Sequence, residues 1–496
     1  MHRYTAQTDA DDASPLIRSG GSAVPTRVRT VMPPSGGRQP VPPWLCRELE
    51  SVPPLESFAT VDELAEATCR IAAQHPDVVT LRRVGTSAQG EALSCLTIES
   101  SGAGPTTPDA LVVGLPHPNE PIGGLTALHL ARRLAEDSEL RSRLGHRWHV
   151  VTCIDPDGLR LNEGWLKGPY TRDHYARHFY RQAGPEQIEW SFPLDYKQAW
   201  FDAVPPETFA LMRLIDEHKP TLLASLHNSE VGGAYYYLSR PEPTLHPVLQ
   251  GIPGRMGIEL DRGEPEAPWM PAIDDGIFPL IDVRDAYDHL EEVGALEAFS
   301  GGNSTGAYAS RHGTLTLVSE LPYWTHPEAL DTTPSDVGYA DALIANAAEL
   351  HTVSEILTRS LTAISPHIQV ETPFLRASRY YAPVIGEQAS ATQRRAASAS
   401  AATRKATVAE LTSMADTVHM FRLRYGGMLL RALDAEAVSG NVRPVIRSVR
   451  RELAALHAAW CVAAAGTSAV TLPLRSLVAV QYGSVLAAAE HLHTSR

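Results

Sequence analysis

Three pairs of histidine and glutamate have the spacing His-x-x-Glu, and such a pair can place two ligands on one metal ion. The pairs are His117 with Glu120, His227 with Glu230, and His289 with Glu292. The first pair comes directly after the apolar run ALVVGL (110–115). A catalytic zinc ion commonly takes three His or carboxylate ligands and keeps a fourth position for water. Because an isolated pair is also typical of a surface turn, a zinc site here requires a third ligand from elsewhere in the chain.

Two further apolar runs end in residues that would complete a zinc site. TLLASL (221–226) is followed by His227, and GTLTLVS (313–319) is followed by Glu320. Ligands in open α/β sheets gather at the carboxyl ends of strands, so we expect these two side chains to meet the first His-x-x-Glu pair. With zinc bound, Glu320 would take a proton from the zinc-bound water and deliver it to a leaving nitrogen.

Each of these residues also has another interpretation. His227 would otherwise be a buried core histidine, Glu230 would replace one of the expected ligands, and Glu320 would pair with a buried cation. The combination of the first pair with two strand ends favours the metal site over these alternatives.

The apolar runs alternate with helical patterns, which indicates one sheet. From residue 110 a strand is followed by a helical segment with apolar residues on one side and then by the strand WHVVTCI (148–154). Residues 77–100 look like two strands joined by a turn. This alternation predicts an α/β protein with a mostly parallel sheet covered by helices.

The chain divides into three expected regions. Residues 1–55 are rich in Ser, Gly, Pro, Arg and Asp and lack apolar periodicity, which predicts a disordered or mobile arm. Residues 56–333 contain the predicted sheet. Thr333 and Pro334 look like a helix start, and the apolar residues that follow recur at helical spacing. We therefore expect an α-helical C-terminal domain over residues 334–496.

Composition narrows the classes of function. The 496 residues include 43 basic and 57 acidic side chains, a net charge of −14, which argues against a general binder of nucleic acid or anionic membranes. Five cysteines without a Cys-x-x-Cys motif argue against a disulfide framework or a thiolate zinc site. The N-terminal stretch lacks the apolar core expected of a signal peptide, and we find no run of about 18 apolar residues in this sequence. We expect a cytoplasmic protein without a membrane partner, with the helical domain as the surface for any homo-oligomer.

Four motifs follow one another in order along the sheet region. They are His-x-x-Glu (117–120), Pro-Asp-Gly (156–158), Ser-Leu-His (225–227) and the strand-end Glu320. This order resembles that of the zinc carboxypeptidases of the carboxypeptidase A type, over residues of about 60 to 330. One departure is Asp155, which stands before Pro-Asp-Gly where the family has an asparagine.

The resemblance implies a fold and a mechanism. The fold would be an α/β/α sandwich around a mixed, mostly parallel sheet, followed here by the helical domain. One Zn²⁺ ion would be bound by His117, Glu120 and His227. Glu320 would be the general base in the hydrolysis of a peptide or related amide bond.

The resemblance is weaker on the substrate side. The family has an arginine that stabilises the oxyanion, and Arg172 is the best match, with Arg177 and Arg181 as competitors. The family also binds the terminal carboxylate of the substrate with an Asn-Arg pair, and here Tyr196 and Lys197 take its place. A lysine can bind a carboxylate as a point charge but cannot form the bidentate fork of an arginine.

The substrate-capping tyrosine of the family has no clear match. Phe299 has the nearest spacing, and Tyr308 lies closer along the chain to the expected base, so we take Tyr308 as a substrate-binding candidate. The loop GGNSTGAY (301–308) has no charged residue, which favours small or polar substrate groups. The run Tyr235 to Tyr237 is expected to supply strand and core residues.

These observations lead to one main hypothesis and two alternatives. The main hypothesis is a zinc-dependent, carboxypeptidase-like hydrolase acting on a peptide or an amino-acid conjugate. An N-acyl-amino-acid deacylase would use the same chemistry. A catalytically silent scaffold would instead bind a protein partner through the helical domain.

Overall fold

A central sheet of eight strands, in the order β1-β2-β4-β3-β7-β10-β8-β9, carries most of the predicted site. The computed structural model describes residues 41–495 except 100, 101, 103, 105, 297 and 298. The strands are β1 (Val79–Thr86), β2 (Ala92–Ile98), β3 (Asp109–Gly114), β4 (Arg147–Val151), β7 (Leu222–His227), β8 (Tyr235–Leu238), β9 (Ile277–Pro279) and β10 (Leu315–Glu320). The four central strands β4, β3, β7 and β10 are parallel, and antiparallel pairing begins at β2 and at β8. The sheet is therefore mixed and mostly parallel at its centre, as predicted.

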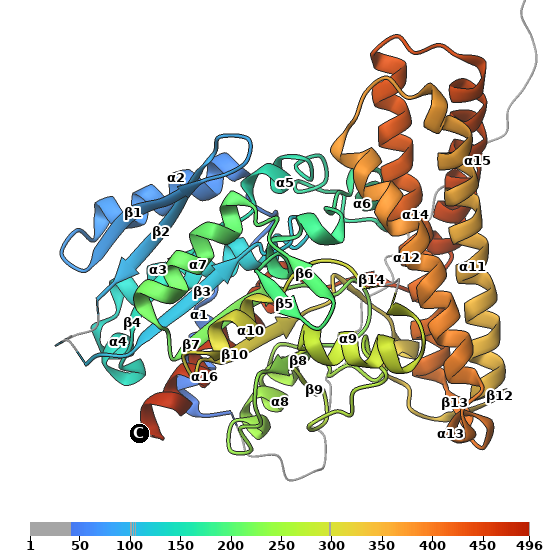
Figure 1. Cartoon of the computed structure of the whole chain (residues 1–496). Helices are drawn as coiled ribbons and strands as arrows, with labels where there is room; N and C mark the ends of the chain where they lie inside the picture. Colours follow the sequence, from blue (N-terminus) through green and yellow to red (C-terminus); the bar gives the residue numbers. More distant parts are fainter. Residues whose placement is uncertain (1–40, 100–101, 103, 105, 297–298, 496) are drawn as a thin grey trace, which may run out of the picture. The chain divides into compact units, whose positions relative to one another are not determined.

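Helices cover both faces of the sheet because its strands are apolar on both sides (Figure 1). Successive side chains of a strand point to opposite faces. Ala110 and Val112 of β3 belong to a core shared with α3, whereas Leu111 and Val113 belong to a second core shared with α7. This arrangement confirms the predicted α/β fold with a helix-covered sheet.

The helices of this part of the chain are short. They are α1 (Pro43–Ser51), α2 (Val61–Gln74), α3 (Ile122–Glu136), α4 (Ser138–Leu144), α5 (Pro156–Arg160), α6 (Arg172–His178), α7 (Pro206–His218), α8 (His246–Arg255), α9 (Val283–Glu292) and α10 (Thr305–Ser310). Thr60 starts α2 with a capping box, since its hydroxyl accepts from Glu63 N and the Glu63 carboxylate accepts from Thr60 N. A hairpin of β5 (Leu194–Tyr196) and β6 (Ala199–Phe201) lies outside the main sheet.

Four longer helices follow the sheet region. They are α11 (Tyr339–Ile364), α12 (Pro373–Ala396), α14 (Val408–Val438) and α15 (Pro444–Ala465). The predicted apolar positions Leu343, Leu350, Val353 and Leu357 of α11 are buried. The polar, alanine-rich stretch after residue 388 continues α12 as far as Ala396 and then forms the short α13 (Ala399–Ala402).

Three details differ from the expected boundaries. Residues 43–51 were expected in a mobile arm but form α1, because Leu45 and Leu49 are buried; the arm's residues 1–40 lie outside the described part. The first long helix starts at Tyr339, because residues 334–338 form β12, which pairs with β13 (Lys405–Thr407). The division into a catalytic and a helical domain near residue 334 stays a prediction.

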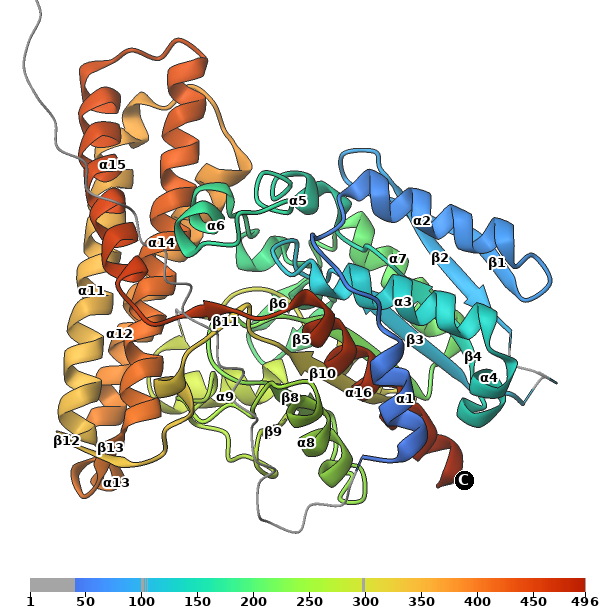
Figure 2. The ribbon, with the colours of Figure 1, turned by 180° about the vertical axis from the view of Figure 1, so that it is seen from behind.

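The third difference is α16 (Leu474–Thr494), the last helix. It packs on α1 and α3 beside the sheet and not among the four long helices (Figure 2). Before α16, the chain returns from the long helices to the sheet region, where β14 (Val470–Thr471) pairs with β11 (Trp324–Thr325). None of the described helices is long and apolar enough to cross a membrane.

Candidate functional site

The ends of three adjacent parallel strands bring the predicted ligands and base together. His227 is the last residue of β7 and Glu320 is the last residue of β10, and the two are paired in register. On the other side of β7, β3 ends at Gly114, and a short turn leads from there to His117 and Glu120. All four side chains are buried at the same edge of the sheet.

Gly123, in the first turn of α3, permits this close arrangement. A Cβ atom at Gly123 would lie 2.8 Å from the carbonyl oxygen of Leu226 and 3.0 Å from its Cβ. A larger residue would push α3 away from β7 and would move the preceding turn, which carries Glu120.

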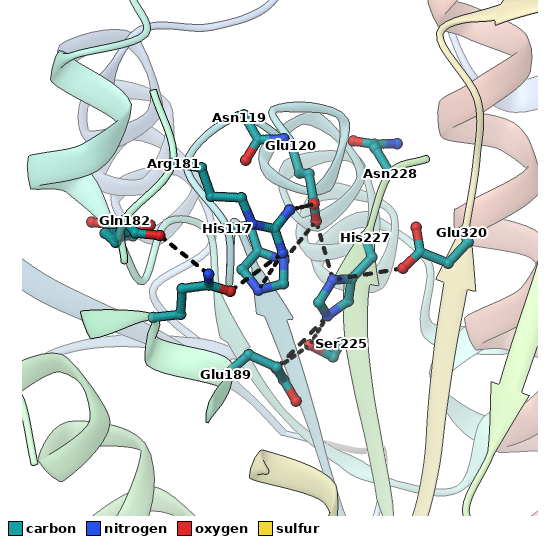
Figure 3. A network of polar contacts seen from close by, with 12 residues as sticks. His117, Asn119, Glu120, Arg181, Gln182, Glu189, Ser225, His227, Asn228 and Glu320 are labelled. Atoms are coloured by element: carbon teal, nitrogen blue, oxygen red, sulfur yellow. Dashed lines mark hydrogen bonds and ion pairs between the residues drawn. The ribbon is translucent and has the colours of Figure 1, made fainter. Parts of the chain in front are cut away.

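The three predicted ligands converge on one point (Figure 3). Nδ1 of His117 and Nδ1 of His227 each lie 3.1 Å from Oε2 of Glu120. The two imidazole rings meet edge to face, with centroids 4.8 Å apart. With zinc bonds of about 2.0–2.2 Å, neighbouring ligand atoms of a tetrahedral site lie about 3.3 Å apart. The spacing of these three atoms therefore suits a zinc ion.

His227 also has the outer partners that are typical of a metal-binding histidine. Its Nε2 lies 2.9 Å from the Ser225 hydroxyl and 3.7 Å from Oε2 of Glu189. Ser225 donates to the same carboxylate oxygen at 3.1 Å. A carboxylate behind a ligating histidine fixes its tautomer and leaves the other ring nitrogen free for the metal.

Arg181 lies directly against the other two ligands. Its Nη1 donates to Oε1 of Glu120 (2.9 Å), and its Nη2 lies 3.0 Å from Nε2 of His117. Because a guanidinium only donates hydrogen bonds, Nε2 of His117 must accept and Nδ1 must carry the proton, which it donates to Glu120. Binding of zinc at Nδ1 would move that proton to Nε2, which would end the contact with Arg181.

Burial shifts the pKa values of the cluster. Burial lowers the pKa of His117 to about 4, and the nearby Arg181 acts in the same direction. Burial raises the pKa of Glu320 to about 8, although the charge of His227 opposes the shift. Burial acts to raise the pKa of Glu120 as well, but His117 and His227 outweigh it and hold this pKa well below its usual range. Glu120 is thus suited to a metal ligand and Glu320 to a proton carrier.

The structure does not bring Arg172 to this cluster. Its guanidinium is buried, and it donates to Asp416 of α14 (2.8 Å) and to Glu230 (3.3 Å). Arg424 of α14 binds the second carboxylate oxygen of Glu230 at 2.6 Å. Arg172 and Glu230 therefore belong to a buried ionic network, and Arg181 occupies the place expected for Arg172.

The expected substrate pair lies on the β5–β6 hairpin and faces α9. Lys197 binds Asp288 (2.8 Å) and Glu291 (2.6 Å), and the Tyr196 hydroxyl donates to Asp288. Lys197 lies at the hairpin turn with a φ of 51°. Both acidic partners already neutralise the lysine, so this geometry gives no support to carboxylate binding by Lys197.

Tyr308 lies at the opposite edge of the sheet from the cluster. Its hydroxyl donates to Asp216, near the end of α7, where the following strand β7 begins. This position gives no support to a substrate-binding role for Tyr308, because the predicted site lies where β7 ends. Tyr236 and Tyr237 are buried strand residues as predicted, whereas Tyr235 is paired with Glu320 in the register of β8 and β10.

A second group with metal-ligand chemistry lies where β3 and β4 begin. It consists of Asp109, His149 and His218. Both oxygens of Asp109 accept from Arg147, at 2.6 and 2.8 Å, and His149 binds Asp109 at 2.7 Å. The rings of His149 and His218 are stacked, with centroids 3.6 Å apart, so their nitrogen lone pairs do not converge. This group is therefore an ion-paired network in the structure.

Several residues around the ligands carried no signal in the sequence. In the sequence, Arg181 was one of three arginines that could stabilise the oxyanion. Gln187 and Glu189 belong to none of the four motifs, and Ser225 belongs only to Ser-Leu-His. Ser225 shares a face with His227 because it is two residues away on the same strand. That offset is the one sequence feature that could have identified it.

Comparisons with known proteins agree with the motifs. The sequence profile of zinc carboxypeptidases matches residues 65–247. Similar solved structures include carboxypeptidase A from Helicoverpa armigera (14% identity, 68% of this chain, 73% of that chain, TM-score 0.37). A metallo-carboxypeptidase from Burkholderia cenocepacia is a further example (15% identity, 53% of this chain, 59% of that chain, TM-score 0.33). Another is the metallo-carboxypeptidase from Pseudomonas aeruginosa (17% identity, 52% of this chain, 59% of that chain, TM-score 0.32). No curated protein matches the sequence. Residues 65–247 of the chain are thus similar in sequence to zinc carboxypeptidases.

Proposed function

We propose that this protein is a zinc-dependent hydrolase that cleaves an amide bond of a peptide or an amino-acid conjugate. The observation that carries the proposal is the convergence of Nδ1 of His117, Oε2 of Glu120 and Nδ1 of His227, with Glu320 beside them. Zinc bound there would activate a water molecule and polarise the scissile carbonyl. The donor set of two imidazoles and one carboxylate suits this ion.

Glu320 is the residue suited to move the proton. Its Oε1 lies 3.9 Å from Nδ1 of His227, next to the ligand cluster. Burial raises its pKa to about 8, close enough to neutral pH for the carboxylate to accept a proton and release it again. It would accept a proton from the attacking water and donate it to the leaving nitrogen.

Arg181 takes the role that the sequence suggested for Arg172. Its guanidinium lies on the ligand cluster, and loss of the His117 contact in the zinc-bound form would free donors for an oxygen of the substrate. Donors placed where negative charge develops lower the barrier of acyl transfer. We therefore assign oxyanion stabilisation to Arg181.

The test combines metal content with activity. Purified protein is expected to contain one zinc per chain by mass spectrometry of the metal and to release amino acids from peptides. Glu320→Gln is expected to keep zinc and to lose about 10²–10⁴-fold in kcat, the contribution typical of a general base. Protein without stoichiometric zinc, or a Glu320→Gln variant with unchanged kcat, would refute the proposal.

The same assay separates the alternatives. Peptides and N-acylated amino acids are offered together, and the preferred substrate is identified from the products. Preference for the acylated amino acids would indicate a deacylase that uses the same residues. Tight zinc binding without hydrolysis of either class would indicate a silent scaffold.

A further inference from the structure

A chain of hydrogen bonds connects Arg181 to the C-terminal helices. Arg181 Nη2 donates to Oε1 of Gln187 (3.4 Å), and Nε2 of Gln187 donates to the hydroxyl of Tyr381 on α12 (2.7 Å). The Tyr381 hydroxyl donates in turn to the carbonyl of Gln182 (3.0 Å). We propose that Tyr381 is a positioning residue, which holds the Arg181 guanidinium beside the metal ligands through Gln187. Its effect on catalysis rests on the proposed hydrolytic function.

The donors and acceptors of this chain permit one orientation of the Gln187 amide. Oε1 must face Arg181, because a guanidinium only donates. Nε2 then faces two acceptors, the Tyr381 hydroxyl and the carbonyl of Gln182 at 3.2 Å. A flipped amide would place a donor against Arg181 and an oxygen against the Gln182 carbonyl. Since Gln182, Gln187 and Tyr381 are buried, water cannot readily replace these bonds.

Packing between two helices fixes Tyr381 itself. Its ring stacks on Tyr425 of α14, with centroids 4.2 Å apart and an angle of 21° between the planes. Arg181 lies on the segment between α6 and β5, which contains the short 3-10 helices η1 (Gly184–Glu186) and η2 (Ile188–Trp190). Because this segment has little regular structure, contacts from α12 help to fix the side chains on it.

Zinc binding makes this support more important. Without metal, Arg181 contacts His117, Glu120 and Gln187. Ligation of zinc through Nδ1 of His117 would make Nε2 a donor and would remove the first contact. Glu120 would share its charge with the metal. The contact with Gln187, which Tyr381 orients, involves none of the expected ligands and would remain.

The test uses two adjacent tyrosines of α12. Tyr381→Phe removes the hydroxyl and keeps the ring that stacks on Tyr425. Tyr380→Phe is the matched control, because the Tyr380 hydroxyl contacts Ser300 at 3.2 Å and takes no part in the Gln187 chain. The first readout is the rate at which phenylglyoxal, a guanidine reagent, modifies Arg181 in the zinc-loaded full chain, followed by peptide mass spectrometry. The second readout is kcat with KM for a peptide.

Tyr381→Phe is expected to raise the modification rate of Arg181 and to lower kcat, each about fivefold, the factor that one net hydrogen bond contributes. KM, zinc content and the Tyr380→Phe control are expected to stay at wild-type values. An unchanged modification rate, an equal change in Tyr380→Phe, or a loss of zinc from Tyr381→Phe would overturn the inference. A raised rate together with a wild-type protein that hydrolyses no peptide would leave the positioning role intact and refute the hydrolytic function.

Discussion

Replacing Arg172 with methionine removes one of the two arginines from a buried ionic network. Arg172 binds Asp416 and Glu230, and Arg424 binds the other oxygen of Glu230. Asp416 also contacts Nε2 of His326 at 2.8 Å. The side chains of Arg172 and Glu230 are only 6% and 3% exposed, so solvent screens their charges poorly.

The size of the effect follows from what the substitution leaves behind. Arg172→Met leaves Asp416 with His326 alone and Glu230 with Arg424 alone. Removing the only partner of a buried charge typically costs about 3–5 kcal/mol. Because each carboxylate here keeps one partner, we expect Arg172→Met to cost about 3 kcal/mol, the lower end of that range. A second substitution, Asp416→Leu, removes one of those carboxylates. The double variant is therefore expected to cost about 1–3 kcal/mol less than the sum of the single variants.

The assay is urea unfolding followed by fluorescence, with the midpoint and slope compared among variants. Arg177→Met is the matched control on the same helix, because Arg177 is exposed and lies 4.0 Å from Asp173. Its free energy of unfolding is expected to change by no more than about 0.5 kcal/mol. An Arg172→Met variant as stable as the control, or strictly additive single variants, would refute the reasoning.

Two further predictions concern metal and pH. Zinc added to the metal-free protein at about 100 times its Kd should raise the free energy of unfolding by about 2.7 kcal/mol. Thermal melts with and without zinc measure this gain, and the His227→Ala variant should show none. Burial raises the pKa of Asp155 to about 7 from an ordinary value of 3.8, so the folded state binds a proton more tightly than the unfolded state. Its contribution to stability is therefore present at low pH and lost as pH rises from about 4 to 7. Urea midpoints of wild type and Asp155→Asn across this range should diverge, and parallel profiles would contradict the assignment.

The meeting of His117, Glu120, His227 and Glu320 at one edge of the sheet could be predicted from the sequence, because local signals specify it. His227 and Glu320 directly follow apolar runs, and parallel strands of a sheet bring their carboxyl ends to one edge. The turn with His117 and Glu120 has the same relation to β3. These predictions depend only on where the apolar runs end and on the parallel pairing of the strands. The alternation of apolar runs with helical patterns indicates that pairing.

The residues around the substrate could not be predicted in the same way. Which of three arginines reaches the ligands depends on the short helices between α6 and β5, and on Tyr381, a residue of α12 that lies far away in the sequence. Lys197 has the residue type expected for carboxylate binding, but its ammonium group binds two acidic neighbours on α9 instead. Motif spacing contains no information on either contact.

The last helix, α16, is a second part of the chain that is distant in sequence and contacts the site. Gln481 of α16 is fully buried, and its Nε2 donates to the carbonyls of His227 (2.6 Å) and Ser319 (3.3 Å). Its Oε1 accepts from the Thr126 hydroxyl of α3 at 2.9 Å. Carbonyls at strand ends need a partner when they are buried, and here one glutamine supplies it to both β7 and β10. Residues 474–494 therefore add a link between the ends of β7 and β10, which the strand pairing already holds in register, although the motifs that define the site end at Glu320.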